Sequence, residues 1–243
     1  MSTFVLIHGA WHGGWCWDKV VPFMQKAGHV VEAPDLPGHG EDRTPIGKIS
    51  LQLYADRVCE ILDEQPEPVV LVGHSMGGMV VTQAAEQRPE KIKTSVYLTA
   101  YLLRDGQSLL QAALADADSL VLPSLIFAED QSYTTVKDEA VKEVFYGDCS
   151  DEDVARARSL LRPQALAPTA TPVSTTEENF GRVPRVYIEC LRDRALTPSA
   201  PKEMYSAVAC RRVISMDTSH SPFYSAPEEL AAHLTSLERQ EQG

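Results

Sequence analysis

The pentapeptide Gly73-His-Ser-Met-Gly77 holds a serine between two glycines. This G-x-S-x-G spacing is typical of a nucleophile elbow, in which a tight turn from a strand into a helix presents the serine hydroxyl to a substrate. The turn favours neighbours without side chains because its backbone is strained and closely packed. Five letters recur by chance, so the pattern has weight only where a strand precedes it and a helix follows it. Ser75 is therefore a candidate nucleophile for acyl transfer.

A serine hydroxyl is a poor nucleophile unless a base accepts its proton, and an acid must hold that base in the correct tautomer. His220, in the loop 217–222, is the candidate base, and Asp193 is the candidate acid. The alternative interpretation of Asp193 is a solvated loop charge. Asp217 is its rival, but it precedes His220 by too few residues to reach the far ring nitrogen easily. Ser75, Asp193 and His220 thus form a candidate catalytic triad.

Six apolar segments of strand length alternate with amphipathic segments of helix length. Such alternation implies an α/β fold whose sheet is mostly parallel and is flanked by helices through right-handed crossovers. The expected strands are 3–7, 30–33, 69–72, 94–99, 185–190 and 212–216, and the expected helices are 18–26, 50–62, 76–88, 200–208 and 227–238.

The alternation stops between residues 101 and 180. Helical segments at 108–117 and 151–161 are separated by prolines, and no strand of comparable strength occurs there. We expect a helical cap inserted after the fourth strand, with 167–176 as a linker back to the sheet. The predicted organisation is a core of residues 1–100 and 181–243, with 101–180 as cap and linker.

The candidate residues all follow strands. In a sheet of this kind, ligands bind at the carboxyl ends of the strands. Ser75 follows the third expected strand, Asp193 the fifth and His220 the sixth, while the segment 8–10 follows the first. Three chemically necessary residues are therefore expected at one edge of the sheet, in the chain order that the G-x-S-x-G fold requires.

Longer motifs give the chain a family likeness. It resembles the α/β-hydrolases, and in particular the branch that contains plant methyl esterases, hydroxynitrile lyases and bacterial pyrethroid-type carboxylesterases. The resemblance covers most of the core and is weak from 101 to 180. It implies an α/β-hydrolase fold in which Asp193 orients His220. The motifs are Val5-Leu-Ile-His-Gly-Ala10, Trp15-Cys-Trp17, Ala33-Pro-Asp-Leu-Pro-Gly-His-Gly40, Gly73-His-Ser-Met-Gly-Gly78 and the two C-terminal loops.

The tetrahedral intermediate of acyl transfer carries an oxyanion, which needs preorganised N–H donors. In this fold they come from the residue after the nucleophile, here Met76, and from the loop after the first strand. The resemblance assigns the second donor to Ala10, and Gly9 lets that loop approach closely. By the family pattern His74 is a structural neighbour of the nucleophile. His8 is expected to brace the loop through hydrogen bonds.

The expected substrate-binding residues lie near predicted loops or the cap. Each alone is more often packing than binding, but together they favour an apolar organic ester of small to medium size, such as an aromatic, terpenoid or pyrethroid-like one. The sequence thus predicts a serine carboxylic-ester hydrolase that works through an acyl-enzyme. The residues are Gly9, Trp11, His12, Phe127, Tyr133 and Phe223.

Two other functions compete with ester hydrolysis. In the hydroxynitrile lyases the resemblance implies a threonine at the position of Gly9 and a lysine directly after the histidine, where this chain has Ser221. The other alternative is a small-ligand receptor on a hydrolase scaffold. Such receptors commonly lose or slow the triad, whereas all three members are present here.

Composition excludes several classes of partner. The 243 residues carry a formal net charge of −12 and an isoelectric point near 5.0, which disfavours nucleic acids and anionic membrane surfaces. Five scattered cysteines suggest reduced thiols rather than a disulfide framework or a metal site. The chemistry requires no metal or organic cofactor. No basic leader or membrane-spanning stretch is evident, so we expect a cytoplasmic protein. The sequence is compatible with a homodimer.

Overall fold

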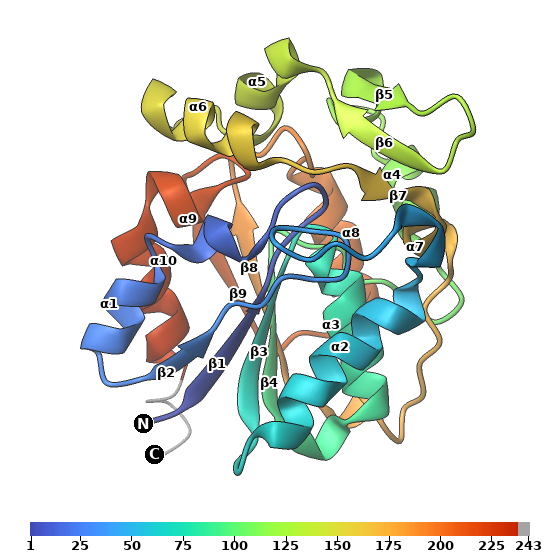
Figure 1. Ribbon diagram of the computed structural model, residues 1–243. Coiled ribbons are helices and arrows are strands. Elements are labelled where there is room, and N and C mark those ends of the chain that lie inside the picture. The colour runs from blue at the N-terminus through green and yellow to red at the C-terminus, as the bar shows by residue number, and fades with distance from the viewer. Residues whose placement is uncertain (238–243) are drawn as a thin grey trace.

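A six-stranded sheet forms the centre of the computed structural model, which describes residues 1–237 (Figure 1). Its strand order is β2-β1-β3-β4-β8-β9, and every neighbouring pair is parallel. The predicted parallel sheet is confirmed. The strands are β1 (Thr3–Ile7), β2 (Val30–Glu32), β3 (Val69–His74), β4 (Ile92–Leu98), β8 (Arg185–Cys190) and β9 (Arg212–Met216).

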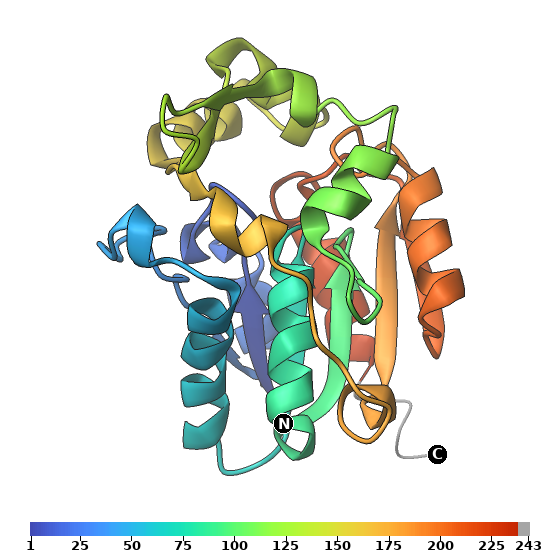
Figure 2. The same cartoon turned by 90° about the vertical axis from the view of Figure 1, so that its right-hand side faces the viewer.

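Helices cover both faces of the sheet. Helices α1 (Val21–Lys26) and α10 (Pro227–Ser236) pack together on one face. Three helices lie on the opposite face, namely α2 (Leu51–Glu64), α3 (Gly77–Gln87) and α8 (Ser199–Ala207) (Figures 1 and 2). The two layers bury the sheet on both sides, which is why every residue of β3 is buried.

The helix expected at 18–26 begins later than predicted. A 3-10 turn at Gly14–Trp17 comes first, and α1 starts only at Val21. Pro22 explains the difference, because proline is favoured in the first turn of a helix and breaks a helix from inside. At the other end of the chain, the expected helix 227–238 is observed as α10, and Glu238 lies outside the described residues.

The segment between β4 and β8, called the insertion below (residues 101–180), is not purely helical as expected. It contains a small antiparallel sheet in the order β5-β6-β7 as well as helices. These strands are too short for their apolar residues to form a recognisable pattern. The elements are α4 (Leu109–Ala115), β5 (Leu125–Phe127), β6 (Tyr133–Val136), α5 (Val141–Phe145), α6 (Asp151–Leu160), β7 (Gln164–Ala165) and α7 (Leu166–Ala170).

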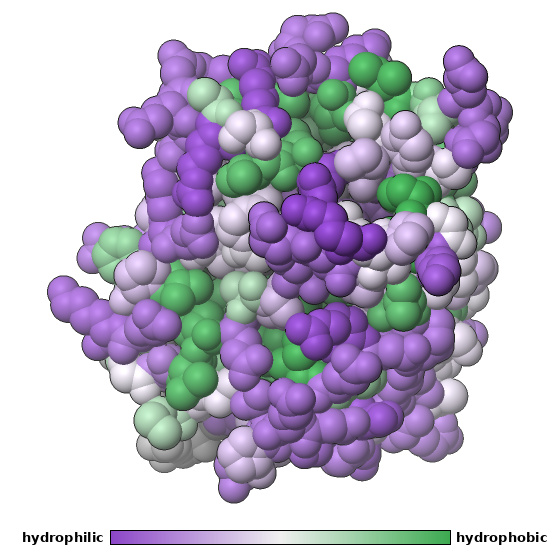
Figure 3. Space-filling model, viewed as in Figure 1, coloured by the Kyte–Doolittle hydropathy of each residue, from purple (hydrophilic) through white to green (hydrophobic). Residues whose placement is uncertain are grey.

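The insertion covers the carboxyl ends of the strands. Helices α5 and α6 and strands β5 and β6 lie above that end of the sheet (Figure 1). On the face shown in Figure 3, hydrophilic residues predominate and hydrophobic ones form small groups between them. Within residues 1–237, no helix is long and apolar enough to cross a membrane.

Candidate active site

Ser75 lies in the turn between β3 and α3. Its φ of 53° falls in the left-handed region, which non-glycine residues rarely adopt and which is typical of strained functional turns. A Cβ added to Gly77 would stand 2.8 Å from the carbonyl oxygens of both Ile7 and His8. A glycine is therefore required at position 77, because the end of β1 closely approaches the turn. This packing fixes the position of Ser75.

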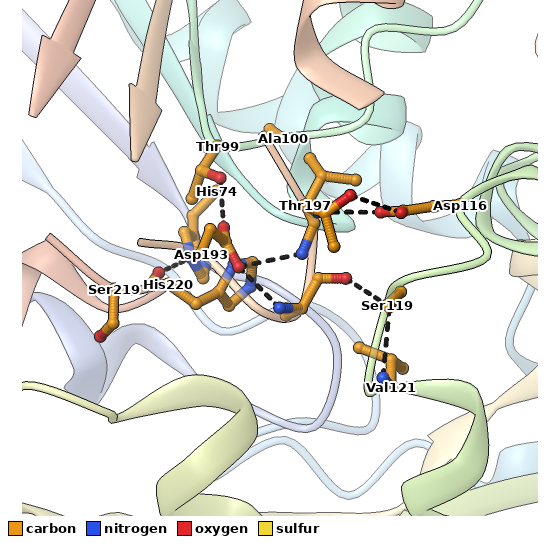
Figure 4. A network of polar contacts seen from close by, with 12 residues as sticks. His74, Thr99, Ala100, Asp116, Ser119, Val121, Asp193, Thr197, Ser219 and His220 are labelled. Atoms are coloured by element: carbon orange, nitrogen blue, oxygen red, sulfur yellow. Dashed lines mark hydrogen bonds and ion pairs between the residues drawn. The ribbon is translucent and has the colours of Figure 1, made fainter. Parts of the chain in front are cut away.

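His220 and Asp193 form a buried pair (Figure 4). The Nδ1 atom of His220 lies 2.6 Å from Oδ2 of Asp193, and the two side chains are 2% and 0% exposed. A carboxylate only accepts hydrogen bonds, so Nδ1 carries the proton, and in the neutral form of the ring Nε2 keeps its lone pair. This is the tautomer that a general base next to a serine requires.

Three further donors hold the Asp193 carboxylate. Oδ1 accepts the backbone N–H groups of Ala195 at 2.7 Å and Leu196 at 2.9 Å. Oδ2 also accepts the hydroxyl of Thr99 at 2.5 Å. A buried charge needs such compensation. Asp217, the rival acid, has a side chain that is 79% exposed and pairs with Arg192 at 3.0 Å.

His74 connects the serine turn to the His220 loop. Its Nε2 lies 2.8 Å from the carbonyl oxygen of His220, and the two rings are 4.6 Å apart between centroids. Because burial lowers the pKa of His74 well below its ordinary value, the ring is neutral at pH 7. The residue before Ser75 thus holds the loop of the candidate base against the turn.

The two expected oxyanion donors belong to buried residues, Ala10 in the loop after β1 and Met76 in the turn of Ser75. Ala10 is 8% exposed and Met76 is 1% exposed. In the described part of the chain, neither N–H donates to a backbone carbonyl. His8 braces the loop, because its Nε2 accepts the N–H of Leu36 at 3.0 Å and its Nδ1 lies 2.8 Å from the carbonyl oxygen of Gly9. Ala10 and Met76 line the same cavity as Ser75, so the N–H groups of these two buried residues are candidates for binding an oxyanion there.

An apolar cavity opens beside Ser75 and extends under the insertion. None of its lining residues in the described chain is acidic, basic or histidine, so the cavity suits an uncharged organic molecule. The lining comes from the β1 loop, the serine turn, the insertion and the Asp193 loop. It comprises Ala10, Trp11, Ser75, Met76, Tyr101, Leu109, Leu110, Ala113, Val121, Leu122, Leu125, Phe127, Thr134, Phe145, Gln164, Leu166, Thr169, Ala195 and Leu196.

Two of the expected substrate-binding residues lie on this cavity. Trp11 is buried at its wall, where its indole N–H donates to the carbonyl oxygen of Thr134 at 3.1 Å. Phe127 is 53% exposed, which places it where the cavity meets solvent.

The other four do not line the cavity. Phe223 is fully buried with its ring 4.9 Å from that of His74, so it packs against that histidine. Tyr133 precedes Thr134, which lines the cavity, and alternation along β6 directs Tyr133 to the opposite face.

Gly9 faces the serine turn, since a Cβ there would be 2.9 Å from Cβ of Ser75. His12 is hydrogen-bonded between Ala10 and the insertion.

Sequence reasoning missed several residues around the site. Thr99 directly follows β4, so the rule about carboxyl ends of strands could have found it. Tyr101 lies two residues further on, by the same rule. Leu109 reaches the cavity through the packing of the insertion, for which the sequence has no signal, and Leu196 lies on it in the loop that follows Asp193. Among residues 1–237, no group of three or more His, Cys, Asp or Glu side chains is placed to hold a metal ion.

Comparison with known proteins agrees with this fold. A pyrethroid hydrolase of Sphingobium wenxiniae is 33% identical over 95% of this chain and 85% of its own length. Methylesterase 2 of Arabidopsis thaliana is 32% identical over 96% of this chain and 95% of its own. The crystal structure of a pyrethroid hydrolase from Sphingobium faniae superposes with a TM-score of 0.87 at 29% identity, covering 97% of this chain and 96% of that one. Residues 4–233 match the model of the alpha/beta hydrolase family, and the chain therefore belongs to that family.

Proposed function

We propose that the chain hydrolyses uncharged carboxylic esters through an acyl-enzyme on Ser75. The observation that carries the proposal is the buried 2.6 Å contact between His220 and Asp193, held against a serine turn that opens into an apolar cavity. The family relatives are named as a methylesterase and a pyrethroid hydrolase, and the chain is accordingly a carboxylic-ester hydrolase.

In the acylation half, Oγ of Ser75 attacks the ester carbonyl while its proton passes to Nε2 of His220. The oxyanion of the tetrahedral intermediate is bound by the N–H groups of Ala10 and Met76. The bond to the alcohol oxygen then breaks, and His220 returns the proton to the leaving alcohol. Asp193 stabilises the imidazolium that forms in between, without itself taking the proton.

In the deacylation half, water replaces the alcohol. His220 accepts a proton from the water as its oxygen attacks the acyl carbonyl, and the same two N–H groups bind the second oxyanion. Collapse breaks the bond to Ser75 and returns the proton to Oγ. The products are one carboxylic acid and one alcohol, and the enzyme is regenerated.

The substrate is expected to be apolar in both its acyl and alcohol parts. Among the described residues, the cavity lining has no acidic, basic or histidine side chain, and transferring a charged group into such a site without a partner is costly. Aromatic, terpenoid or pyrethroid-like esters fit this description. The insertion supplies much of the lining, and we propose that it acts as the cap that determines specificity.

The two alternatives are less well supported. Gly9 and Ser221 replace the threonine and lysine that the lyases of this branch are expected to carry, so incubation with mandelonitrile should release no cyanide above background. A receptor without turnover does not require the ordered tautomer of His220 that the Asp193 contact imposes.

The test is hydrolysis of p-nitrophenyl butyrate by the wild type and by Ser75→Ala. We expect the rate to fall at least about a thousandfold in the variant. Ser206→Ala is the control, because this serine is exposed on α8, and it should retain the wild-type rate. Equal rates for wild type and Ser75→Ala would contradict the proposal.

We also propose a cytoplasmic location. All five cysteines of the chain lie in the described part and are free, as expected in a reducing compartment. Two Arabidopsis thaliana relatives carry "chloroplastic" in their names, so the chloroplast is the alternative that cell fractionation must exclude.

A further inference from the structure

One turn of the insertion reaches both loops of the candidate site. It comprises Tyr146, Gly147 and Asp148, directly after α5, and it is closed by a hydrogen bond of 3.0 Å from the N–H of Cys149 to the carbonyl oxygen of Tyr146. Tyr146 is fully buried, and the Asp148 side chain is only 13% exposed. Neither residue lines the cavity.

Tyr146 connects the turn to the loop after β1 that contains Gly9 and Ala10, called the oxyanion loop below. Its hydroxyl lies 2.5 Å from Nε2 of His12, whose Nδ1 lies 2.7 Å from the carbonyl oxygen of Ala10. Burial lowers the pKa of His12 to about 4, so the ring is neutral at pH 7. The tyrosine hydroxyl then donates to Nε2, and Nδ1–H donates to the carbonyl of Ala10. Two consecutive hydrogen bonds thus fix the residue expected to bind the oxyanion.

Asp148 connects the same turn to the His220 loop. Its Oδ2 accepts the N–H of Ser219 at 2.8 Å, and its Oδ1 accepts the hydroxyl of Ser219. Arg192 donates to Oδ2 at 3.3 Å. Ser219 precedes His220, which it adjoins in Figure 4, and Arg192 precedes Asp193. One carboxylate therefore binds the neighbours of both members of the buried pair.

We propose that the turn 146–148 is a positioning element of the hydrolytic site, with Tyr146 fixing the oxyanion loop through His12 and Asp148 fixing the His220 loop through Ser219. The inference rests on the proposed function. Because both loops are held by one turn of three residues, the turn sets the spacing between oxyanion donor and base. Catalysis depends steeply on such spacing.

The alternative is that the turn merely fastens the insertion to the core. Other contacts already do so, including the ion pairs Lys19–Asp153 at 2.7 Å and Arg194–Glu143 at 2.5 Å. In the sequence, Arg192 directly precedes Asp193 and Arg194 directly follows it. The Glu143 side chain is 59% exposed, and no hydrogen bond described for it in residues 1–237 reaches the His220 loop. Glu143→Gln is therefore a matched control for Asp148: it removes an ion pair between insertion and core without touching the His220 loop.

The test compares Tyr146→Phe, Asp148→Asn, Asp148→Ala and Glu143→Gln with the wild type, using p-nitrophenyl butyrate and a thermal melt for each variant. We expect Tyr146→Phe and Asp148→Ala to lower kcat about 10- to 100-fold, with KM changed by less than about twofold. The kcat of Asp148→Asn should lie between that of Asp148→Ala and that of the wild type, because the amide oxygen of the new side chain still accepts one hydrogen bond from Ser219. Glu143→Gln should keep the wild-type kcat.

A second measurement reads the geometry without turnover. The Nδ1 proton of His220 lies in a short charge-assisted hydrogen bond to Asp193, so it should give a far-downfield NMR resonance. We expect Asp148→Ala to broaden or remove that resonance and Glu143→Gln to keep it. The inference would be overturned if Tyr146→Phe and Asp148→Ala kept the wild-type kcat, or if these substitutions changed only KM. An unchanged NMR resonance in Asp148→Ala would also overturn it. Wild-type protein without Ser75-dependent hydrolysis would instead overturn the proposed function.

Discussion

His220 and Asp193 are 27 residues apart in the chain, yet Nδ1 of the one lies 2.6 Å from Oδ2 of the other. Neighbouring strands β8 and β9 bring them together, because Asp193 follows the first and His220 the second. Parallel strands end at the same edge of the sheet, so residues distant in sequence meet there.

Asp193→Asn tests this pair. The amide cannot hold the imidazole in the required tautomer, so kcat should fall by about 10⁴-fold while KM changes little. Steady-state kinetics with p-nitrophenyl butyrate measure both constants. Asp217→Asn is the control, because loss of the exposed ion pair with Arg192 should change kcat by no more than about twofold. The opposite ranking of the two variants would mean that Asp217 is the acid.

Thr99→Val tests the support of the Asp193 carboxylate. The variant keeps the shape of the side chain but removes the hydroxyl that lies 2.5 Å from Oδ2. A hydrogen bond to a charged group contributes about 1.5–3 kcal/mol, and we expect kcat to fall about tenfold or more.

The matched control for Thr99 is Thr82→Val. Thr82 is also buried, but its hydroxyl lies 2.9 Å from the hydroxyl of Tyr97, away from the candidate site. This variant should lower the melting temperature while kcat stays within about twofold of the wild type. Equal effects of both substitutions on kcat would show that Thr99 acts only on stability.

Gly9→Ala tests the contact between the oxyanion loop and the serine turn. The added Cβ would stand 2.9 Å from Cβ of Ser75 and 3.0 Å from Nδ1 of His74, so one of the two segments must move. We expect kcat/KM to fall about 10- to 100-fold. Gly47→Ala is the control, since a Cβ there meets no atom within 4 Å. A fully active Gly9→Ala enzyme would show that the spacing is not critical.

Stability should fall as the pH is lowered. Burial lowers the pKa of His8 and His74 well below 6.5, and that of His12 from 6.5 to about 4. At a pH between the pKa of a histidine in the folded chain and its pKa in the unfolded chain, only the unfolded chain binds the proton. The stabilisation is therefore complete above about pH 6.5 and is lost as the pH falls towards about 4, by up to about 1.4 kcal/mol per pH unit for each histidine.

Urea unfolding at about pH 7.5 and about pH 5 measures this effect through the free energy of unfolding. His12→Asn, which cannot titrate, should show a shallower decline than the wild type. A free energy that stays constant or rises at the lower pH would contradict the expected burial of neutral histidines.

The sequence predicted the sheet and the positions of Ser75, Asp193 and His220 along it because each depends on local pattern. A strand, a glycine turn and a helix are visible in a short window, and the carboxyl-end rule then groups residues that follow strands. The same rule also applies to Thr99, which directly follows β4.

The cavity could not be predicted in the same way. Its wall depends on how the insertion packs, and β5 and β6 contain only 3 and 4 residues. In such short strands the sequence does not indicate which alternate residue faces the cavity, and Thr134 does so instead of Tyr133. Phe223 was expected to bind the substrate, whereas it packs against His74 and does not line the cavity, and only tertiary packing decides between these positions.

The central claim is that Ser75 forms the acyl-enzyme. Rapid acid quench during hydrolysis of p-nitrophenyl butyrate, followed by peptide mass spectrometry, tests it most directly. We expect a butyryl group on the peptide that contains Ser75, and none on that peptide in Ser75→Ala. A butyryl group on another residue, or turnover in Ser75→Ala at the wild-type rate, would contradict the claim.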